Sequence, residues 1–520
     1  MSYINWGSES PDQLALRRYL EDQALYEQAV RARIRATQGA VAGSSNLQTT
    51  PEPPPVPDGF TSTWITTTPG ETISLPYQSD GTYSGTIYWG DGTTSVNSYA
   101  NREHEFATPG NYTIMVDGGI IGFSFNNPGV NPVMAPKLLN ISKWNAINFG
   151  NSGEYFIGCT ELTITATDTP NFTGTTNLTS MFEDCTSLTD IPNIAAWPTQ
   201  NVTDMSRMFM SATSFNGDLA GLQVDSVTDM TDMFNDASAF NGTLNWSVSS
   251  LVNARRMFYQ ATSFEGYGLE GWSTAALEDA SYMFAGCSSF NGEIGNWVTS
   301  SVTTMGYMLY AATSFVQEAL YWDTSNVEDM SGMFQDAYLT NIDLTPNNIV
   351  IPEYWNTANV TTMANMFYNG LNPAKGALTG IELWDVSSVT DMSFMFAGCS
   401  SFNAPLGFNG WSKGGRTLNV INMNSMFDNC FAFDQNIGTW NISSLQTATN
   451  FMANKTTADF SYLDNIYTLW NTFIENNGVP LSVVIDFGSI QYTGGGSTAE
   501  QSRNKLLNSF SWTITDGGTL

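Results

Sequence analysis

The chain has 520 residues, of which 42% are hydrophobic and 12% charged, and its formal net charge is −31. This length and composition allow two to four globular domains, and the strong acidity argues against nucleic-acid binding. No run of 18 apolar residues occurs, and no basic segment followed by an apolar one opens the chain, so the sequence predicts neither a membrane span nor a signal peptide.

The first predicted element is a helix over residues 11–36. This stretch is rich in strong helix formers, with Pro11 at its start, acids early and arginines at its end. Its apolar stripe is only partial, and a proline-rich linker follows at residues 39–59. We therefore expect residues 1–38 to be an anchoring helix that attaches the protein to a partner and is not part of the core.

Residues 60–118 alternate short apolar runs with turn residues, as expected of β-strands. Asp91-Gly92 is a hairpin signal, and Tyr112, Ile114 and Val116 form one face of a predicted strand. The segments 89–93 (WGDGT) and 104–116 (HEFATPGNYTIMV) together resemble the polycystic-kidney-disease (PKD) domain. The resemblance implies a small immunoglobulin-like β-sandwich that serves as a spacer or a weak binder.

His104 is the single histidine of the chain, and we interpret it as a turn histidine that is hydrogen-bonded to backbone. Without a second histidine, no further Ser-His-Asp or Cys-His set can be assembled. A hydrolytic pair of carboxylates stays open, because 48 acids are present, but no spacing selects two of them. The sequence therefore predicts no catalytic residue, no cofactor and no metal site.

A repeat dominates residues 144–452. A Met-Phe unit recurs most often at steps of 24 to 27 residues, a tryptophan usually stands eleven residues before the Met, and further apolar residues stand six and three before it. Because the apolar set falls at i, i+3, i+7 and i+10, we predict a short helix with one buried face in every coil, followed by a short strand. The Met-Phe positions, one of them Met-Leu, begin at residues 181, 208, 233, 257, 283, 308, 333, 366, 395 and 426.

This pattern predicts an α/β solenoid of the leucine-rich-repeat type with about twelve coils, in which neighbouring tryptophans touch. The solenoid and its N-terminal cap would span residues 119–458, and residues 459–520 would form the C-terminal cap, with a helix near 462–476 and a strand near 483–487. All five cysteines stand three residues after the Phe of their coil, where other coils have alanine, so we expect them to fill a small buried slot.

Units such as Asn201 to Phe209, followed by the Ser-Phe-Asn-Gly of residues 214–217, resemble the BspA-like leucine-rich-repeat surface proteins, in their phage-type variant. The resemblance covers roughly residues 137–517. It departs from the family at 155–156, which lacks the Met pair, and after Phe334, which lacks Ser-Phe-Asn. The family implies adhesion or recognition at a bacterial or phage surface, with no fixed chemistry.

Our leading hypothesis is a non-enzymatic structural protein of a bacteriophage virion, a fibre or decoration, that is attached to other virion proteins through residues 1–38. It would be exposed on the particle and bind a host-surface protein or polysaccharide. Assembly inside the cell and release by lysis would explain a surface-type repeat without an export signal. Two alternatives stay open: a virion enzyme that degrades polysaccharide, and a secreted adhesin of the bacterial surface. The protein could also be a homo-oligomer.

Irregular coils indicate where a partner could bind. The spacing from Phe334 to Trp355 and from Phe367 to Trp384 is longer than in other coils, and residues 412–418 add an insertion. Insertions at corresponding positions of neighbouring coils form loops that lie near one another, and such loops commonly form binding surfaces. Neutral loop drift explains the same insertions and is the simpler interpretation. The candidate partner-binding residues are Asn347, Asn348, Tyr354, Lys375, Lys413 and Arg416.

Overall fold

The computed structural model describes residues 58–126, 132–145, 147–317, 320–339, 342–343, 355–372, 378–406, 411 and 416–520. One compact unit spans Asp58–Leu520, and residues 1–57 make up the other. The predicted anchoring helix and nearly all of the linker thus lie outside the described residues. In the part of the chain that is described, no helix has the length and apolar character needed to cross a membrane.

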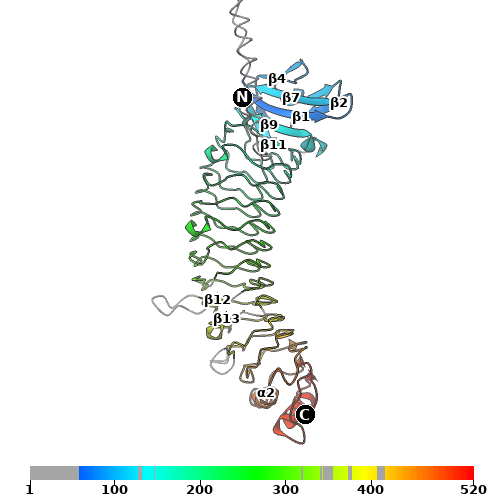
Figure 1. Cartoon of the computed structure of the whole chain (residues 1–520), viewed down its shortest axis with the longest axis vertical. Coiled ribbons are helices and arrows are strands. Elements are labelled where there is room, and N and C mark those ends of the chain that lie inside the picture. The colour runs from blue at the N-terminus through cyan, green and yellow to red at the C-terminus, as the bar shows by residue number, and fades with distance from the viewer. Residues whose placement is uncertain are drawn as a thin grey trace, which may run out of the picture. The chain divides into compact units, whose positions relative to one another are not determined.

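Three β-sheets open the described unit (Figure 1). The largest has the strand order β11-β9-β1-β7-β4-β5, and two smaller sheets have the orders β10-β8-β3 and β2-β6. The strands are β1 Phe60–Thr66, β2 Glu71–Ser74, β3 Tyr77–Tyr83, β4 Thr86–Tyr88, β5 Thr94–Val96, β6 Glu103–Phe106, β7 Gly110–Asp117, β8 Ile120–Phe123, β9 Leu138–Lys143, β10 Ile147–Asn148 and β11 Thr163–Ile164.

The hairpin and the strand that the sequence predicts in this region are confirmed. β4 and β5 pair antiparallel on either side of Asp91-Gly92, and β7 buries Ile114 and Val116 while Tyr112 is half-buried. The largest sheet continues past residue 118, because β9 pairs with β1 and β11 pairs with β9. The strands of the N-terminal region therefore merge with the first repeat coil.

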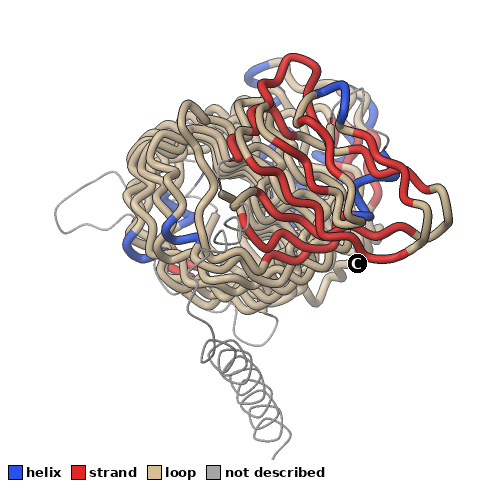
Figure 2. Tube along the Cα trace, turned by 90° about the horizontal axis from the view of Figure 1, so that it is seen from above, coloured by secondary structure: helices blue, strands red, loops and turns tan. Residues whose placement is uncertain are grey.

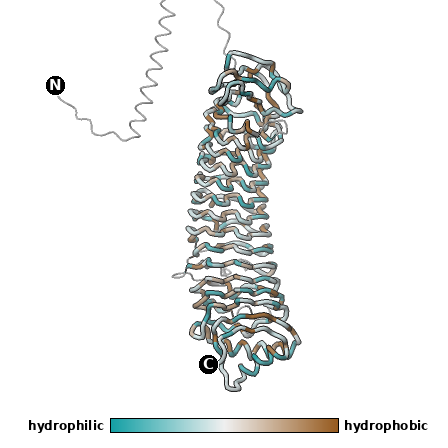
Figure 3. Tube along the Cα trace, turned by 90° about the vertical axis from the view of Figure 1, so that its right-hand side faces the viewer, coloured by the Kyte–Doolittle hydropathy of each residue, from teal (hydrophilic) through white to brown (hydrophobic). Residues whose placement is uncertain are grey.

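The repeats stack one above another along the described unit (Figures 1 and 3). Backbone N–H groups of one coil donate to carbonyls of the next; the bond from Phe234 to Met257 is 2.8 Å long and that from Phe258 to Met283 is 2.9 Å. Isolated parallel β-bridges join one residue of each coil to the corresponding residue of the next coil. They run through Asn177, Asp204, Asp229, Asn253, Asp279, Thr304, Asp329, Thr362, Asp391, Asn422 and Thr447.

The predicted α/β solenoid is wrong, because the repeated helices and strands are absent from the described coils. The Met-Phe segment forms consecutive tight turns in which the Met181 N–H donates to the Leu178 carbonyl and the Cys185 N–H to the Phe182 carbonyl. Ser180 and Asp184 have φ values of 54° and 60°, which no α-helix allows. Such turns also bury every third or fourth residue, so the apolar spacing mimicked a helix.

The α-helices among the described residues are α2, Leu463–Asn477, and α3, Thr498–Ser509. Most of each coil is turn or loop when viewed along the stack (Figure 2). Short 3-10 turns interrupt the coils and the N-terminal region: η1 Tyr99–Asn101, η2 Pro132–Lys137, η3 Ile194–Ala196, η4 Leu269–Gly271 and η5 Ile381–Leu383. In place of one continuous α/β solenoid, the chain forms several small, separate sheets linked by coils that stack through single bridges.

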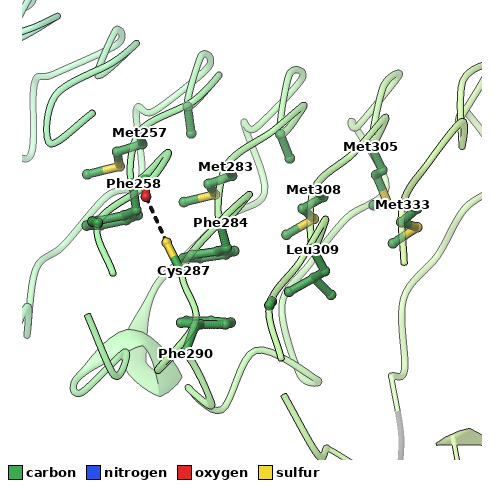
Figure 4. Close-up of a cluster of buried hydrophobic side chains, with 14 of the residues drawn as sticks. Met257, Phe258, Met283, Phe284, Cys287, Phe290, Met305, Met308, Leu309 and Met333 are labelled. Carbon is green, nitrogen blue, oxygen red and sulfur yellow. Dashed lines mark hydrogen bonds between the residues drawn. The ribbon is translucent and has the colours of Figure 1, made fainter. Parts of the chain in front are cut away.

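Side-chain ladders fill the interior of the stack. Trp272 stacks on Trp297 with ring centroids 5.7 Å apart and 3° between the planes, which confirms the predicted contact between neighbouring tryptophans. Each of seven such indoles donates its N–H to a carbonyl of the preceding coil, as in the 2.8 Å bond from Trp272 to Leu244. Buried Met and Phe side chains of successive coils form further columns, as Met257 and Met283 do beside Phe258 and Phe284 (Figure 4).

The C-terminal segment covers the last coil. β14 (Thr447–Ala448), β15 (Val484–Asp486) and β16 (Thr513–Thr515) form a parallel sheet, and α2 packs Tyr467 and Trp470 against Phe487. The predicted helix near 462–476 and strand near 483–487 are confirmed. Between the irregular coils, β12 (Ile342–Asp343) pairs in parallel with β13 (Leu378–Thr379).

Candidate functional site

The loop cluster predicted as a partner site lies mostly outside the described residues: this applies to Asn347, Asn348, Tyr354, Lys375 and Lys413. Arg416 is described. Its guanidinium donates to the carbonyls of Leu383 and Trp384, at 3.1 and 2.8 Å, and lies 4.0 Å from an Asp385 oxygen. Arg416 therefore ties its coil to the preceding one, and its role in binding stays a prediction.

His104 lies on strand β6, so the interpretation of a turn histidine bonded to backbone needs correction. Its Nε2 is 2.8 Å from an Asp91 oxygen, and its ring stacks on Trp89 at 4.8 Å. Burial raises the pKa of Asp91, but hydrogen bonds from Thr93 and His104 outweigh that effect and lower it to about 2. This contact links the β4–β5 turn to β6, a structural role.

The five cysteines fill the buried slot that the repeat predicts, and all are free thiols. The Cys287 Sγ donates to the Phe258 carbonyl of the preceding coil at 2.7 Å (Figure 4). Burial raises the pKa of Cys399 to about 12, and it raises the pKa of the other four thiols as well. Buried thiols with raised pKa values are inert, so they are packing groups.

Two tyrosines, each directly before the Met of its coil, pack against one another on neighbouring coils. Tyr282 and Tyr307 stack with ring centroids 4.8 Å apart, and the Arg255 guanidinium lies 5.8 Å from the Tyr282 ring. A Cβ atom added to Gly332 would lie 2.2 Å from the Tyr307 ring, so the backbone of that glycine covers the ring. Because these ring faces are already in contact with other groups, the pair stabilises neighbouring coils and offers no free aromatic face.

A pocket of about 570 Å³ opens on the surface of the stack. Three consecutive coils line it, with residues 243–245 from one, 265–270 from the next and 291–293 from the third. Its volume lies in the range of small-molecule sites. No single coil contains this site, because it exists only where the three coils are stacked; we call it the Tyr267 pocket.

Two glycines shape the Tyr267 pocket. Gly266 and Gly268 have φ values of 91° and 87°, a backbone conformation that favours glycine. A Cβ atom at Gly266 would lie 2.6 Å from the Phe290 ring, and one at Gly268 would lie 2.6 Å from the Asn245 side-chain oxygen. These close contacts let the chain bulge outward at Tyr267 while it stays packed on both neighbouring coils.

Tyr267 stands between these glycines with its side chain held in place. Its hydroxyl donates to Glu265, whose other carboxylate oxygen accepts from the Asn241 amide at 3.0 Å. The Tyr267 carbonyl accepts from the Leu244 N–H at 2.9 Å. The residue is 54% exposed, and no aromatic ring among the described residues packs on it. The pocket therefore presents an oriented aromatic ring to solvent.

Two more carboxylates face the Tyr267 pocket. Glu270 lies on the 3-10 turn η4, and Glu293 comes from the next coil; both are exposed. Neither side chain has a hydrogen-bond or ion-pair partner in the described part of the chain. No group of three or more His, Cys, Asp or Glu suited to a metal ion occurs among the described residues. The lining can therefore accept hydrogen bonds from a ligand.

The repeat coils match a known protein family. A family model described as "Mycoplasma protein of unknown function, DUF285" matches residues 134–246, 176–267, 242–348 and 347–465. These matches together span well over half of the sequence and include the Tyr267 pocket. The chain belongs to this family. No curated protein and no solved structure matches it.

Membership of the DUF285 family agrees with the resemblance of the repeats to BspA-like surface proteins. The match begins at residue 134, so it leaves the PKD-like resemblance of residues 60–118 as a prediction, together with the phage-type assignment. The family description names no ligand and no reaction.

Sequence reasoning missed the Tyr267 pocket for a definable reason. The distance from Phe258 to Trp272 is 14 residues, which is ordinary among these coils, so the coil showed no insertion. The irregularity is local: Phe264 and Leu269 are five residues apart, whereas Phe240 and Leu244 in the preceding coil are four apart. The Gly-Tyr-Gly of residues 266–268 was the available signal.

Proposed function

We propose that this DUF285-family chain is a non-enzymatic recognition protein, exposed on a bacteriophage particle, that binds a host-surface polymer through its coil stack. The observation that carries the proposal is the Tyr267 pocket, in which three coils present an oriented aromatic ring and open hydrogen-bond acceptors. Surface recognition fits the resemblance of the repeats to BspA-like surface proteins.

The arrangement of the pocket favours binding over hydrolysis. Glycoside hydrolysis by two carboxylates needs one that is kept protonated, usually by an apolar environment. Glu270 and Glu293 are both exposed to water, and Glu265 is already engaged by Tyr267 and Asn241. A polysaccharide-degrading enzyme is the rival proposal, and release of reducing ends from host polysaccharide would support it.

Competition for adsorption tests the proposal. The purified full-length protein, added to host cells before the particles, should occupy the receptor and lower the fraction of particles that adsorb. The control is the same protein after heat denaturation, which should leave adsorption unchanged. Undiminished adsorption at saturating concentrations of folded protein would rule out a direct role in host recognition.

A further inference from the structure

We infer that the Tyr267 pocket binds a non-acidic sugar unit, a hexose or hexosamine, of a surface polysaccharide. This inference rests on the proposed function and narrows it to one site and one ligand class. The face of Tyr267 would pack on the C–H face of the sugar ring, while the lining carboxylates and amides would bind its polar groups.

The Tyr267 ring is exposed and held in one orientation. A tyrosine that is 54% exposed keeps a large apolar face in water, and its hydrogen bond to Glu265 removes most of the conformational freedom that a ligand would otherwise have to freeze. Tyr282 and Tyr307, by contrast, cover each other's rings. The Tyr267 ring is thus ready to pack against a flat, weakly polar surface such as a pyranose.

The polar lining of the Tyr267 pocket is rich in hydrogen-bond acceptors. Glu270 and Glu293 can only accept hydrogen bonds when ionised, and in the described residues nothing donates to them. Sugar hydroxyls and ammonium groups are donors and satisfy such acceptors. Asn245 and Thr243 add side chains that both donate and accept. Donor-rich ligands therefore match this lining.

The negative charge of the Tyr267 pocket excludes acidic sugars. Three glutamates line the pocket, no Lys or Arg does, and the whole chain carries a net charge of −31. A uronate or phosphate group would be repelled at short range and could not replace its water shell with donors from the protein. An ammonium group would gain from the same carboxylates, so hexosamine units should bind more tightly than neutral hexoses.

Three glycines form the floor of the Tyr267 pocket. The backbone of Gly266, Gly268 and Gly292 is packed so closely that added Cβ atoms would meet neighbouring coils at 2.6 to 2.8 Å. The missing side chains let the three coils pack closely, so backbone forms the floor of the pocket at these positions. A sugar unit can then approach the backbone directly while the polymer runs on across the stack.

Binding of three oligosaccharides by the full-length protein tests this inference: glucosamine oligomers, glucose oligomers and oligogalacturonate. We expect glucosamine oligomers to bind best, glucose oligomers more weakly, and oligogalacturonate not at all. Tyr267→Ala should weaken glucosamine-oligomer binding by about tenfold or more, because it removes the packing surface. Glu293→Gln should weaken glucosamine oligomers more than glucose oligomers.

The matched control is Phe431→Ala, because Phe431 is 45% exposed and lies outside the three coils that line the pocket. It should leave sugar binding unchanged. If Tyr267→Ala bound host cells and sugars like the unaltered protein, the pocket would not be the sugar site, while the proposed recognition function would stand. If the unaltered protein bound host cells but preferred oligogalacturonate, the assigned ligand class would be wrong.

Discussion

The ring of Phe258 lies parallel to that of Phe284 in the next coil, with centroids 5.5 Å apart and 5° between the planes. Both side chains are completely buried. The backbone supports the same contact, since the Phe258 N–H donates to the Met283 carbonyl. Ladders of this kind replace the helix and strand that an ordinary leucine-rich repeat would contribute, and they hold the pocket-forming coils in register.

Phe258→Ala should destabilise the protein by about 3–5 kcal/mol, because it leaves a cavity between two stacked neighbours. Chemical denaturation followed by tryptophan fluorescence measures the change. Tyr267→Ala, in the same coil but on the surface, should lower the free energy of unfolding far less. Equal stability of Phe258→Ala and the unaltered protein would contradict the stacking account.

Trp272→Phe and Trp384→Phe form a matched pair of substitutions. The Trp272 indole donates to the Leu244 carbonyl at 2.8 Å, whereas the buried Trp384 N–H has no partner among the described residues. Trp272→Phe should therefore cost about 1 kcal/mol more than Trp384→Phe, the net value of one buried hydrogen bond. Thermal unfolding of both variants measures the difference, and a larger loss for Trp384→Phe would show that the indole bonds contribute little.

Arg256→Ala should destabilise the protein by about 2 kcal/mol. Arg256 binds both carboxylate oxygens of Asp232, at 2.8 and 2.9 Å, and the Asp232 side chain is 2% exposed. Without the guanidinium the carboxylate stays buried and keeps only the bond from the Asn235 amide. Adding Asp232→Asn to Arg256→Ala removes the unpaired charge and should recover part of the loss; denaturation of the single and double variants tests this. If the double variant were less stable than Arg256→Ala, charge burial would not be the cause.

Acid should weaken the N-terminal sheets through Glu71. A hydrogen bond from Lys137, together with N–H groups of Thr67 and Thr68, lowers the pKa of Glu71 from 4.5 to about 2. A carboxyl whose pKa is depressed by folding stabilises the protein above its unfolded pKa, and this contribution is lost as the pH falls from about 4.5 toward 2. Glu71→Gln should flatten that part of the stability profile. An unchanged slope between pH 5 and 2, measured by urea denaturation, would contradict the assignment.

Much of the interior could be predicted from the sequence because side-chain type and period report burial directly. The tryptophan contacts, the cysteine slot, and the helix and strand near the C-terminus were all predicted correctly. Backbone conformation was not, because apolar residues at spacings of three and four fit tight turns as well as helices. Positive φ at non-glycine residues such as Ser180 and Arg207 is imposed by bonding between coils, which local propensity does not encode.

The candidate site was hidden for a related reason. Tyr267, Asn245 and Glu293 come from three coils, and their proximity depends on how the coils stack. Sequence reasoning looked instead for long insertions, and most of the residues it chose lie outside the described part of the chain. Gly266 and Gly268 were visible in the sequence, but their importance follows only from the contacts that their missing side chains permit.

Antibody labelling of purified particles by electron microscopy tests the central proposal most directly. Antibodies against residues 58–520 should decorate particles at a fixed, exposed position, and particles assembled with protein lacking residues 1–57 should lose that label if the predicted anchoring helix attaches the protein. Label on intact particles that disappears with this deletion is the result we predict. Absence of label from particles whose host cells contain the protein would contradict its place on the virion.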